Sequence, residues 1–116
     1  ANPATPNMLG TWTGSAKGYI ERAGYRDFSV ANLTMSVTEQ HDRFFAGTMT
    51  FPLANGSTRS EAFAGVIWTG GKSFRIVEYA SGHDDGIILS ENEIEMVYMD
   101  DNDPSFIMLD TLKRAP

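Results

Sequence analysis

Side chains that could do chemistry are few in this chain, and most of them fall between its apolar runs. The two histidines, His41 and His83, have no cysteine or second histidine at ligand spacing, so neither predicts a zinc site. The triplet of His83, Asp84 and Asp85 could offer an imidazole and carboxylates to a metal ion. A soluble loop explains the same three residues, and we adopt that interpretation.

An acidic run at 100–103, Asp-Asp-Asn-Asp, looks at first like a calcium-binding loop. It lacks the glycine and the glutamate that an EF-hand needs at its sixth and twelfth positions. Pro104 also follows it directly, so we interpret the run as a solvated turn. The sequence therefore predicts no metal and no bound cofactor.

Catalytic motifs are missing as well. The chain has no Gly-x-Ser-x-Gly run, and neither histidine has an obvious serine partner. Glu93 and Glu95 have the spacing of paired carboxylates on a strand, but they alternate with Ile94 and Met96, so both should face solvent. We predict that the protein is not an enzyme.

The length and the acidic balance restrict the class of protein. The chain has 116 residues, enough for one domain, and 15 Asp plus Glu against 9 Lys plus Arg give a net charge of −6. This charge repels phosphate backbones, so we expect no nucleic-acid partner. The absence of cysteine excludes disulfides and thiolate metal sites. No apolar run is long enough for a transmembrane helix.

The first eight residues contain two prolines and no strand pattern. Such a head is typical of a chain that has lost a targeting segment and kept a short tether, although simple trimming would leave the same head. We expect an extracytoplasmic protein, secreted or membrane-tethered, with a flexible tether at 1–8 and one β-barrel domain at 9–116.

Strand signals recur along the rest of the chain, as apolar or β-branched runs between clusters of Gly, Asn and Asp. Residues 18–27 are bracketed by glycines and look like a flap, and a bulge is expected near Ala31. Eight antiparallel strands with short connections predict an all-β fold, a single up-and-down barrel without sheet edges; a two-sheet sandwich is the alternative. The expected strands cover residues 10–17, 28–40, 44–51, 61–68, 73–79, 87–89, 93–99 and 105–113.

The interior of such a barrel is either filled by side chains or open to one small ligand. Six Met, seven Phe, four Tyr and two Trp suit both a packed core and a cavity for a flat or flexible apolar molecule. Alternation in 73–79 requires either Arg75 or Glu78 to point inward, where a buried charge needs a partner, such as Asp110 or Tyr98. Candidates for the cavity or its mouth are Tyr19, Tyr25, Met35, Met49, Trp68, Arg75, Tyr79, Met96, Tyr98, Met108 and Asp110.

The two ends of the chain resemble the calycin pattern of lipocalins and avidins. Gly-Thr-Trp at 10–12 and Thr-Leu-Lys-Arg at 111–114 are similar to the first and last strands of those barrels. The resemblance implies that Trp12 closes one end of the barrel and that Arg114 covers its indole by a cation–π contact. Avidins surround biotin with several tryptophans, whereas this chain has two, so a biotin site is not implied and Asp110 is the only plausible counterpart.

The whole chain also resembles a group of small exported proteins of methanogenic archaea. The shared runs are Gly-Thr-Trp-Thr-Gly at 10–14, Thr-Glu-Gln at 38–40, Phe-x-Gly-Thr at 45–48 and Asp-Thr-Leu-x-Arg at 110–114. This resemblance implies export but no activity.

We therefore expect a small exported barrel that binds a small apolar or aromatic ligand in its cup without catalysis. Its open end would lie near the flap at 18–27, opposite Trp12 and Arg114. The alternative is a barrel with a solid core whose outer face or flap binds a partner protein or forms an oligomer.

Overall fold

The computed structural model describes residues 4–29, 32–52 and 56–116, and the regular structure of these residues is entirely β. None of them forms a helix long and apolar enough to cross a membrane. The strands are β1 (Gly10–Ile20), β2 (Gly24–Asp27), β3 (Leu33–His41), β4 (Phe44–Pro52), β5 (Thr58–Ile67), β6 (Ser73–Glu78), β7 (His83–Ser90), β8 (Glu93–Asp100) and β9 (Phe106–Arg114).

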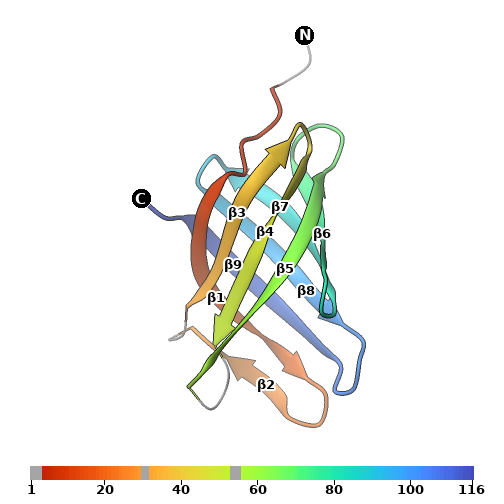
Figure 1. The fold of residues 1–116 in the computed structure, drawn as a ribbon. Helices are drawn as coiled ribbons and strands as arrows, with labels where there is room; N and C mark the ends of the chain where they lie inside the picture. The colour runs from red at the N-terminus through yellow and green to blue at the C-terminus, as the bar shows by residue number, and fades with distance from the viewer. Residues whose placement is uncertain (1–3, 30–31, 53–55) are drawn as a thin grey trace.

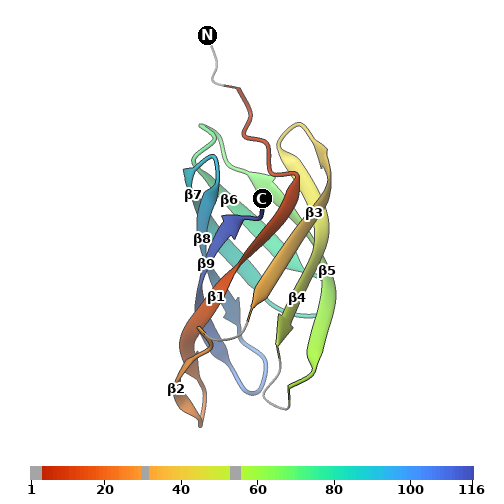
Figure 2. The same cartoon turned by 90° about the vertical axis from the view of Figure 1, so that its left-hand side faces the viewer.

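The sheet closes on itself as the predicted up-and-down barrel. Each strand from β3 to β9 pairs antiparallel with the next, β1 pairs with β3, and β1 also pairs with β9 from Trp12↔Arg114 to Ile20↔Phe106. Figures 1 and 2 show β1 and β9 side by side and β2 projecting beyond one end of the barrel. The eight-stranded closed sheet is confirmed, and β2 is an addition to it.

The flap predicted at 18–27 is regular structure. β1 continues to Ile20, and β2 folds back on it in a hairpin with Ile20 opposite Gly24. β1 extends past Lys17, its predicted end, because Gly18 still pairs with Met108 of β9 in the closed sheet.

Other boundaries also differ from those predicted; β5, for example, begins at Thr58, three residues before its predicted start. β7 begins at His83, within the predicted loop, and Phe28 belongs to the connection after β2 rather than to the next strand. Ala31 lies outside the described residues, and the register shifts fall between Val37 and Glu39 and between Ile88 and Ser90.

One half of the barrel is solid. Phe45 and Phe74 meet edge to face, with ring centroids 5.9 Å apart. Their rings fit because Gly65 and Gly86 face them: a Cβ on Gly86 would lie only 2.1 Å from Phe74. The buried apolar cluster of the barrel comprises Met8, Trp12, Leu33, Met35, Val37, Phe45, Met49, Phe63, Ile67, Phe74, Ile76, Ile94, Met96 and Leu112. Two of its members, Leu33 and Met49, also border the other half of the barrel.

Trp12 and Arg114 close this solid end. The Trp12 side chain is 1% exposed, its indole N–H donates to the Met8 carbonyl at 3.0 Å, and the Arg114 guanidinium carbon lies 4.2 Å from the ring centroid. Arg114 also donates to the backbone carbonyls of Asn7 and Leu9. One arginine thus joins the indole, the incoming chain and the last strand.

The last residues of the tether predicted at 1–8 pack against the barrel, so the tether is shorter than expected. Met8 is 1% exposed, and its N–H donates to the Gln40 side chain at 2.8 Å. Gln40 in turn donates to the Pro6 carbonyl at 2.9 Å. Residues 6–8 therefore belong to the barrel cap, where Met8 is buried and its carbonyl accepts the Trp12 indole N–H.

Trp12→Ala should lower the free energy of unfolding by about 3–5 kcal/mol, since it removes a buried aromatic side chain from a tightly packed end. Urea denaturation measures this change. Trp68→Ala is the matched control, because Trp68 is 57% exposed and its loss should cost no more than roughly 0.5 kcal/mol. An unchanged midpoint for Trp12→Ala would refute its structural role.

Candidate functional site

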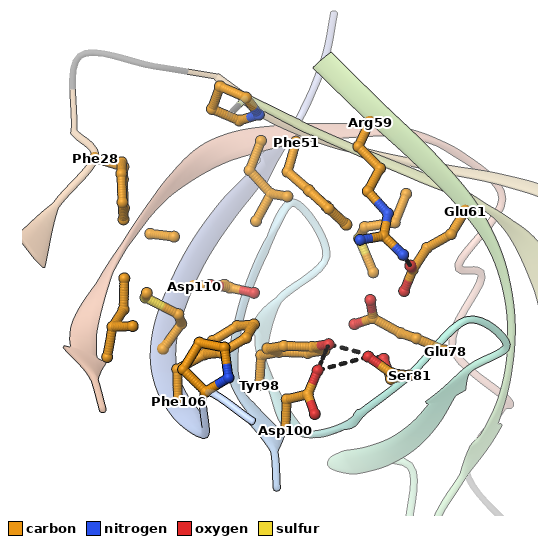
Figure 3. A pocket seen from close by; sticks show the side chains of 17 residues that line it. Phe28, Phe51, Arg59, Glu61, Glu78, Ser81, Tyr98, Asp100, Phe106 and Asp110 are labelled. Atoms are coloured by element: carbon orange, nitrogen blue, oxygen red, sulfur yellow. Dashed lines mark hydrogen bonds and ion pairs between the residues drawn. The ribbon is translucent and has the colours of Figure 1, made fainter. Parts of the chain in front are cut away.

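The other half of the barrel contains a cavity of about 410 Å³. It lies at the end where β2 projects, opposite Trp12 (Figures 1 and 3). Its lining combines inward side chains of the strands with residues of the connecting loops. The lining residues are Ala16, Ile20, Phe28, Leu33, Met49, Phe51, Pro52, Arg59, Glu61, Glu78, Ser81, Tyr98, Asp100, Pro104, Phe106, Met108 and Asp110.

The walls of the cavity are mainly apolar and aromatic. Tyr98 and Phe106 from β8 and β9 lie with ring centroids 5.3 Å apart, and Phe51 from β4 faces them across the cavity (Figure 3). Met49 and Met108 contribute flexible thioethers, which adapt to guests of different shape. A volume of this size matches a small organic molecule.

A hydrogen-bonded group fixes the rim at β8. The Tyr98 hydroxyl lies 2.7 Å from the Ser81 carbonyl and 3.2 Å from the Asp100 carboxylate, to which the Ser81 hydroxyl also donates. Gly82, with φ of 89°, permits this approach, because an added Cβ would lie 2.3 Å from the Tyr98 hydroxyl. Burial raises the pKa of Asp100, but hydrogen bonds from Ser81, Asn102 and Tyr98 outweigh it, and the pKa lies below its usual value.

A second group of carboxyls, by contrast, has almost no partners. We call Glu61, Glu78, Asp84 and Asp110, which come from β5, β6, β7 and β9, the carboxyl cluster. Glu78, Asp84 and Asp110 are 4%, 0% and 6% exposed. Buried oxygens of Glu61, Glu78 and Asp84 have no hydrogen-bond donor among the described residues. Figure 3 shows Glu61, Glu78 and Asp110 directed into the cavity.

Burial favours the protonated forms of Glu78, Asp84 and Asp110. It raises the pKa of Glu78 strongly, and the nearby carboxyls of Asp84 and Glu61 raise it further. Burial also raises the pKa of Asp84. It raises the pKa of Asp110 to about 8, and the charge on Asp84 adds to that rise. Two ionised carboxylates side by side would repel each other, so a proton on Glu78 removes its repulsion with Asp84.

Arg59 is the cation nearest to the cluster. Its guanidinium lies 3.6 Å from the Glu61 carboxylate, and its side chain is 54% exposed at the edge of the cavity. An ion pair this exposed contributes little to stability. It pairs with one of the four carboxyls, and the other three form no ion pair among the described residues.

The structure divides the predicted cavity residues into three groups. Met49, Tyr98, Met108 and Asp110 line the cavity. Met35 and Met96 lie in the solid half. Tyr19, Tyr25, Trp68, Arg75 and Tyr79 lie outside the barrel: the two tyrosines stack on each other at 5.6 Å, Arg75 lies 5.4 Å from the Trp68 ring, and Tyr79 is 66% exposed.

Two acidic segments predicted to be solvated are partly buried. Asp84 points into the barrel, because β7 begins at His83 and its inward positions are Asp84 and Gly86. Asp100 is 7% exposed and belongs to the hydrogen-bonded rim rather than to a solvated turn. Residues 101–103 are exposed as predicted, so the predictions were wrong for Asp84 and Asp100, because a polar side chain need not face solvent.

The predicted cavity residues omitted three of the four carboxyls of the cluster, and they omitted aromatic lining residues such as Phe51 and Phe106. Strand alternation had narrowed the choice to Arg75 or Glu78, and the structure points Glu78 inward, beside Phe74 and Ile76. The same parity, counted back from Gly86, would have placed Asp84 inside. Glu61 has that signal too, since it precedes the inward Phe63 by two residues.

Among the described residues, no group of three or more His, Asp or Glu side chains has an arrangement that could hold a metal ion. Proximity in the cluster therefore does not bring the carboxylate oxygens around one point. The arrangement can accept hydrogen bonds and bind or release protons.

Comparison with known proteins supports the fold alone. No protein-family model matches the chain, and no curated protein matches it. Among solved structures it is similar to a redesigned β-barrel, with a TM-score of 0.65 and 14% identity over 94% of this chain and 92% of that one.

The raised pKa of Asp110 predicts a fall in stability with rising pH. Between the usual value of 3.8 and the folded value of about 8, the unfolded chain releases this proton while the folded chain keeps it, so the free energy of unfolding decreases as pH rises. Asp110→Asn cannot ionise. It should be more stable than wild type by about 1–3 kcal/mol near pH 8, with a smaller gain near pH 5.

Urea denaturation at both pH values measures this effect. Asp85→Asn is the control, because it removes the same charge from the outer face of β7, where Asp85 pairs with Arg75 at 3.3 Å. If Asp110→Asn and Asp85→Asn change stability equally at both pH values, Asp110 has no special ionisation in the folded protein.

Proposed function

We propose that this protein is a non-catalytic barrel that binds a small, partly apolar ligand in the cup formed by its hollow half. The cavity of about 410 Å³, with aromatic walls and one plugged end, is the observation that supports this function. A cup of this kind holds a ligand by burying its apolar surface while a few polar groups fix its orientation.

The energetic cost of the hollow half supports the same proposal. An empty cavity loses packing contacts, and buried carboxyls without donors lose hydration. The other half of the same barrel is solid, with rings fitted over Gly65 and Gly86. The chain can therefore fill a barrel, and a site that binds a ligand explains why this half is left open.

We propose further that the barrel is related to the calycins and is extracytoplasmic. The Trp12–Arg114 contact at 4.2 Å supports the relation to calycins, since lipocalins resemble this chain in having an arginine that covers a tryptophan ring. The resemblance to exported archaeal proteins supports the extracytoplasmic location. Fractionation of source cells would test location, and recovery of chemically unchanged ligand after long incubation would test the absence of catalysis.

Self-association through the outer face is a second candidate function. A shallow groove over β4–β7 is lined by Phe44, Val66 and Val77, and Phe44 and Val77 are 63% and 54% exposed. Exposed apolar groups gathered in this way are typical of contact surfaces. This candidate keeps the interaction role that was predicted from the sequence. It does not keep the predicted solid core, because the cup half of the barrel is hollow.

Titration with phenylpropanol, a neutral molecule with an apolar body, tests the cup. Resonances of isotope-labelled methionine methyl groups should shift at Met49 and Met108, which line the cavity, and stay unchanged at Met35 and Met96 in the solid half. We expect a dissociation constant in the range of roughly 10 µM to 1 mM.

Ala16→Leu, which fills the cavity from β1, should weaken this binding at least several-fold. Ala62→Leu adds the same side chain on the exposed outer face of β5 and is the matched control. Circular dichroism checks that both variants fold. Equal shifts at all four methionines, or binding unaffected by Ala16→Leu, would contradict a ligand in the cup.

Sedimentation velocity tests the outer face. Wild type should associate as its concentration rises, and Phe44→Ser should remain monomeric, because the change replaces an exposed ring in the groove with a small polar group. Monomeric wild-type protein at all concentrations would exclude self-association as the function.

A further inference from the structure

We infer that the ligand of the cup is an organic cation, an ammonium group on an apolar or aromatic body, with its N–H donors directed at Glu78 and Asp110. This inference rests on the proposed ligand-binding function and specifies the chemistry of the ligand. It follows from the imbalance between acceptors and donors inside the barrel.

The charged and titratable groups that face the interior come from a few strands. β5 supplies Arg59 and Glu61, β6 supplies Glu78, β7 supplies Asp84, β8 supplies Tyr98 and Asp100, and β9 supplies Asp110. The inward positions described for β1, β3 and β4 carry no titratable side chain: they are apolar or glycine, except for the neutral Gln40 at the Trp12 end. Asp100 and Tyr98 satisfy each other and Ser81, and Arg59 faces Glu61, which leaves Glu78, Asp84 and Asp110 without a cation.

The carboxyl oxygens without hydrogen-bond donors indicate which chemical groups the ligand must carry. Glu78 is nine-tenths buried or more, its Oε1 has no donor among the described residues, and its side chain points into the cavity (Figure 3). Asp110 points into the same space and has no hydrogen-bond partner within the described chain. Carboxylates accept hydrogen bonds only, and an ammonium offers three donors together with the opposite charge.

The walls suit the rest of such a ligand. The rings of Phe51, Tyr98 and Phe106 surround the space next to the carboxyls. Aromatic faces attract cations and also bury apolar surface. An arylalkylamine would place its nitrogen at the carboxyl cluster and its ring among these side chains.

Binding of a cation should also displace protons. In the free protein, burial keeps a proton on Asp110 up to about pH 8. An ammonium beside this carboxyl favours its ionised form, so the proton leaves as the amine binds. The affinity for an amine should therefore increase from about pH 6 to about pH 8, a range in which an alkylamine itself stays protonated.

Isothermal titration calorimetry tests the inference with three probes that share a phenyl ring and a three-carbon chain. The probes are phenylpropylamine, phenylpropanol and phenylpropanoate. Near pH 8 the amine should bind about tenfold or more tightly than the alcohol, the difference expected between charged and neutral hydrogen bonds. Phenylpropanoate should bind more weakly than the alcohol. The preference for the amine should shrink near pH 6.

Glu78→Gln and Asp110→Asn should each reduce the ratio of amine affinity to alcohol affinity at least several-fold, because each removes one carboxyl from the cup. Asp85→Asn is the control, since it removes one negative charge from the outer face of the same barrel and should leave the preference unchanged. A variant that fails to fold is detected by its loss of alcohol binding, and the other variant then decides the result.

The outcomes separate this inference from the proposed function. If the alcohol binds in the cup and the amine binds no more tightly, the ligand-binding function stands and the cationic ligand is refuted. Tighter binding of phenylpropanoate, or displacement of the amine by Mg²⁺ or Ca²⁺ at equal concentration, also refutes it. If none of the three probes binds, both proposals fail.

Discussion

Pairing of β1 with β9 is the constraint on which the rest of this structure depends. It runs from Trp12↔Arg114 to Ile20↔Phe106 and turns the meander into a closed sheet. Closure gives each barrel strand a neighbour on both sides and fixes which of its side chains face inward. Those side chains occupy most of the interior, and they fill the two halves of the barrel differently.

At the Trp12 end, the interior is filled by matching large side chains with small ones. Phe45 and Phe74 lie over Gly65 and Gly86, and Arg114 fastens the indole to the incoming chain. At the opposite end, the inward positions hold carboxyls and aromatic rings on facing walls, which do not close the space. One half of the barrel therefore stabilises the fold, and the other half is free to bind a ligand. The buried carboxyls that lack hydrogen-bond donors lower the stability of the folded protein.

The sequence was sufficient for the architecture because alternation and turn residues are local signals. Closure also explains why Trp12 and Arg114 could be paired from opposite ends of the chain. The site was predicted only in part, since Met49, Tyr98, Met108 and Asp110 line the cavity but Trp68 and Tyr79 do not. Composition identifies aromatic residues without saying which face they occupy.

The carboxyl cluster was missed for a related reason. Acidic residues are usually solvated, so Asp84 was assigned to a loop, and burying it depends on neighbours from other strands that no single segment reveals. Local rules fail where a chain departs from them to build a site. Glu78 illustrates this limit. Strand alternation required either Arg75 or Glu78 to point inward, but it did not reveal that Asp84 and Glu61 would lie beside Glu78.

A crystal structure of the complex with phenylpropylamine tests the central claim most directly, because it locates the nitrogen. The account predicts the ammonium at hydrogen-bond distance, about 2.7–3.2 Å, from a carboxyl oxygen of Glu78 or Asp110, with the ring among Phe51, Tyr98 and Phe106. An amine bound outside the barrel, or bound in the cup with its nitrogen in solvent and its ring against the carboxyls, would contradict it.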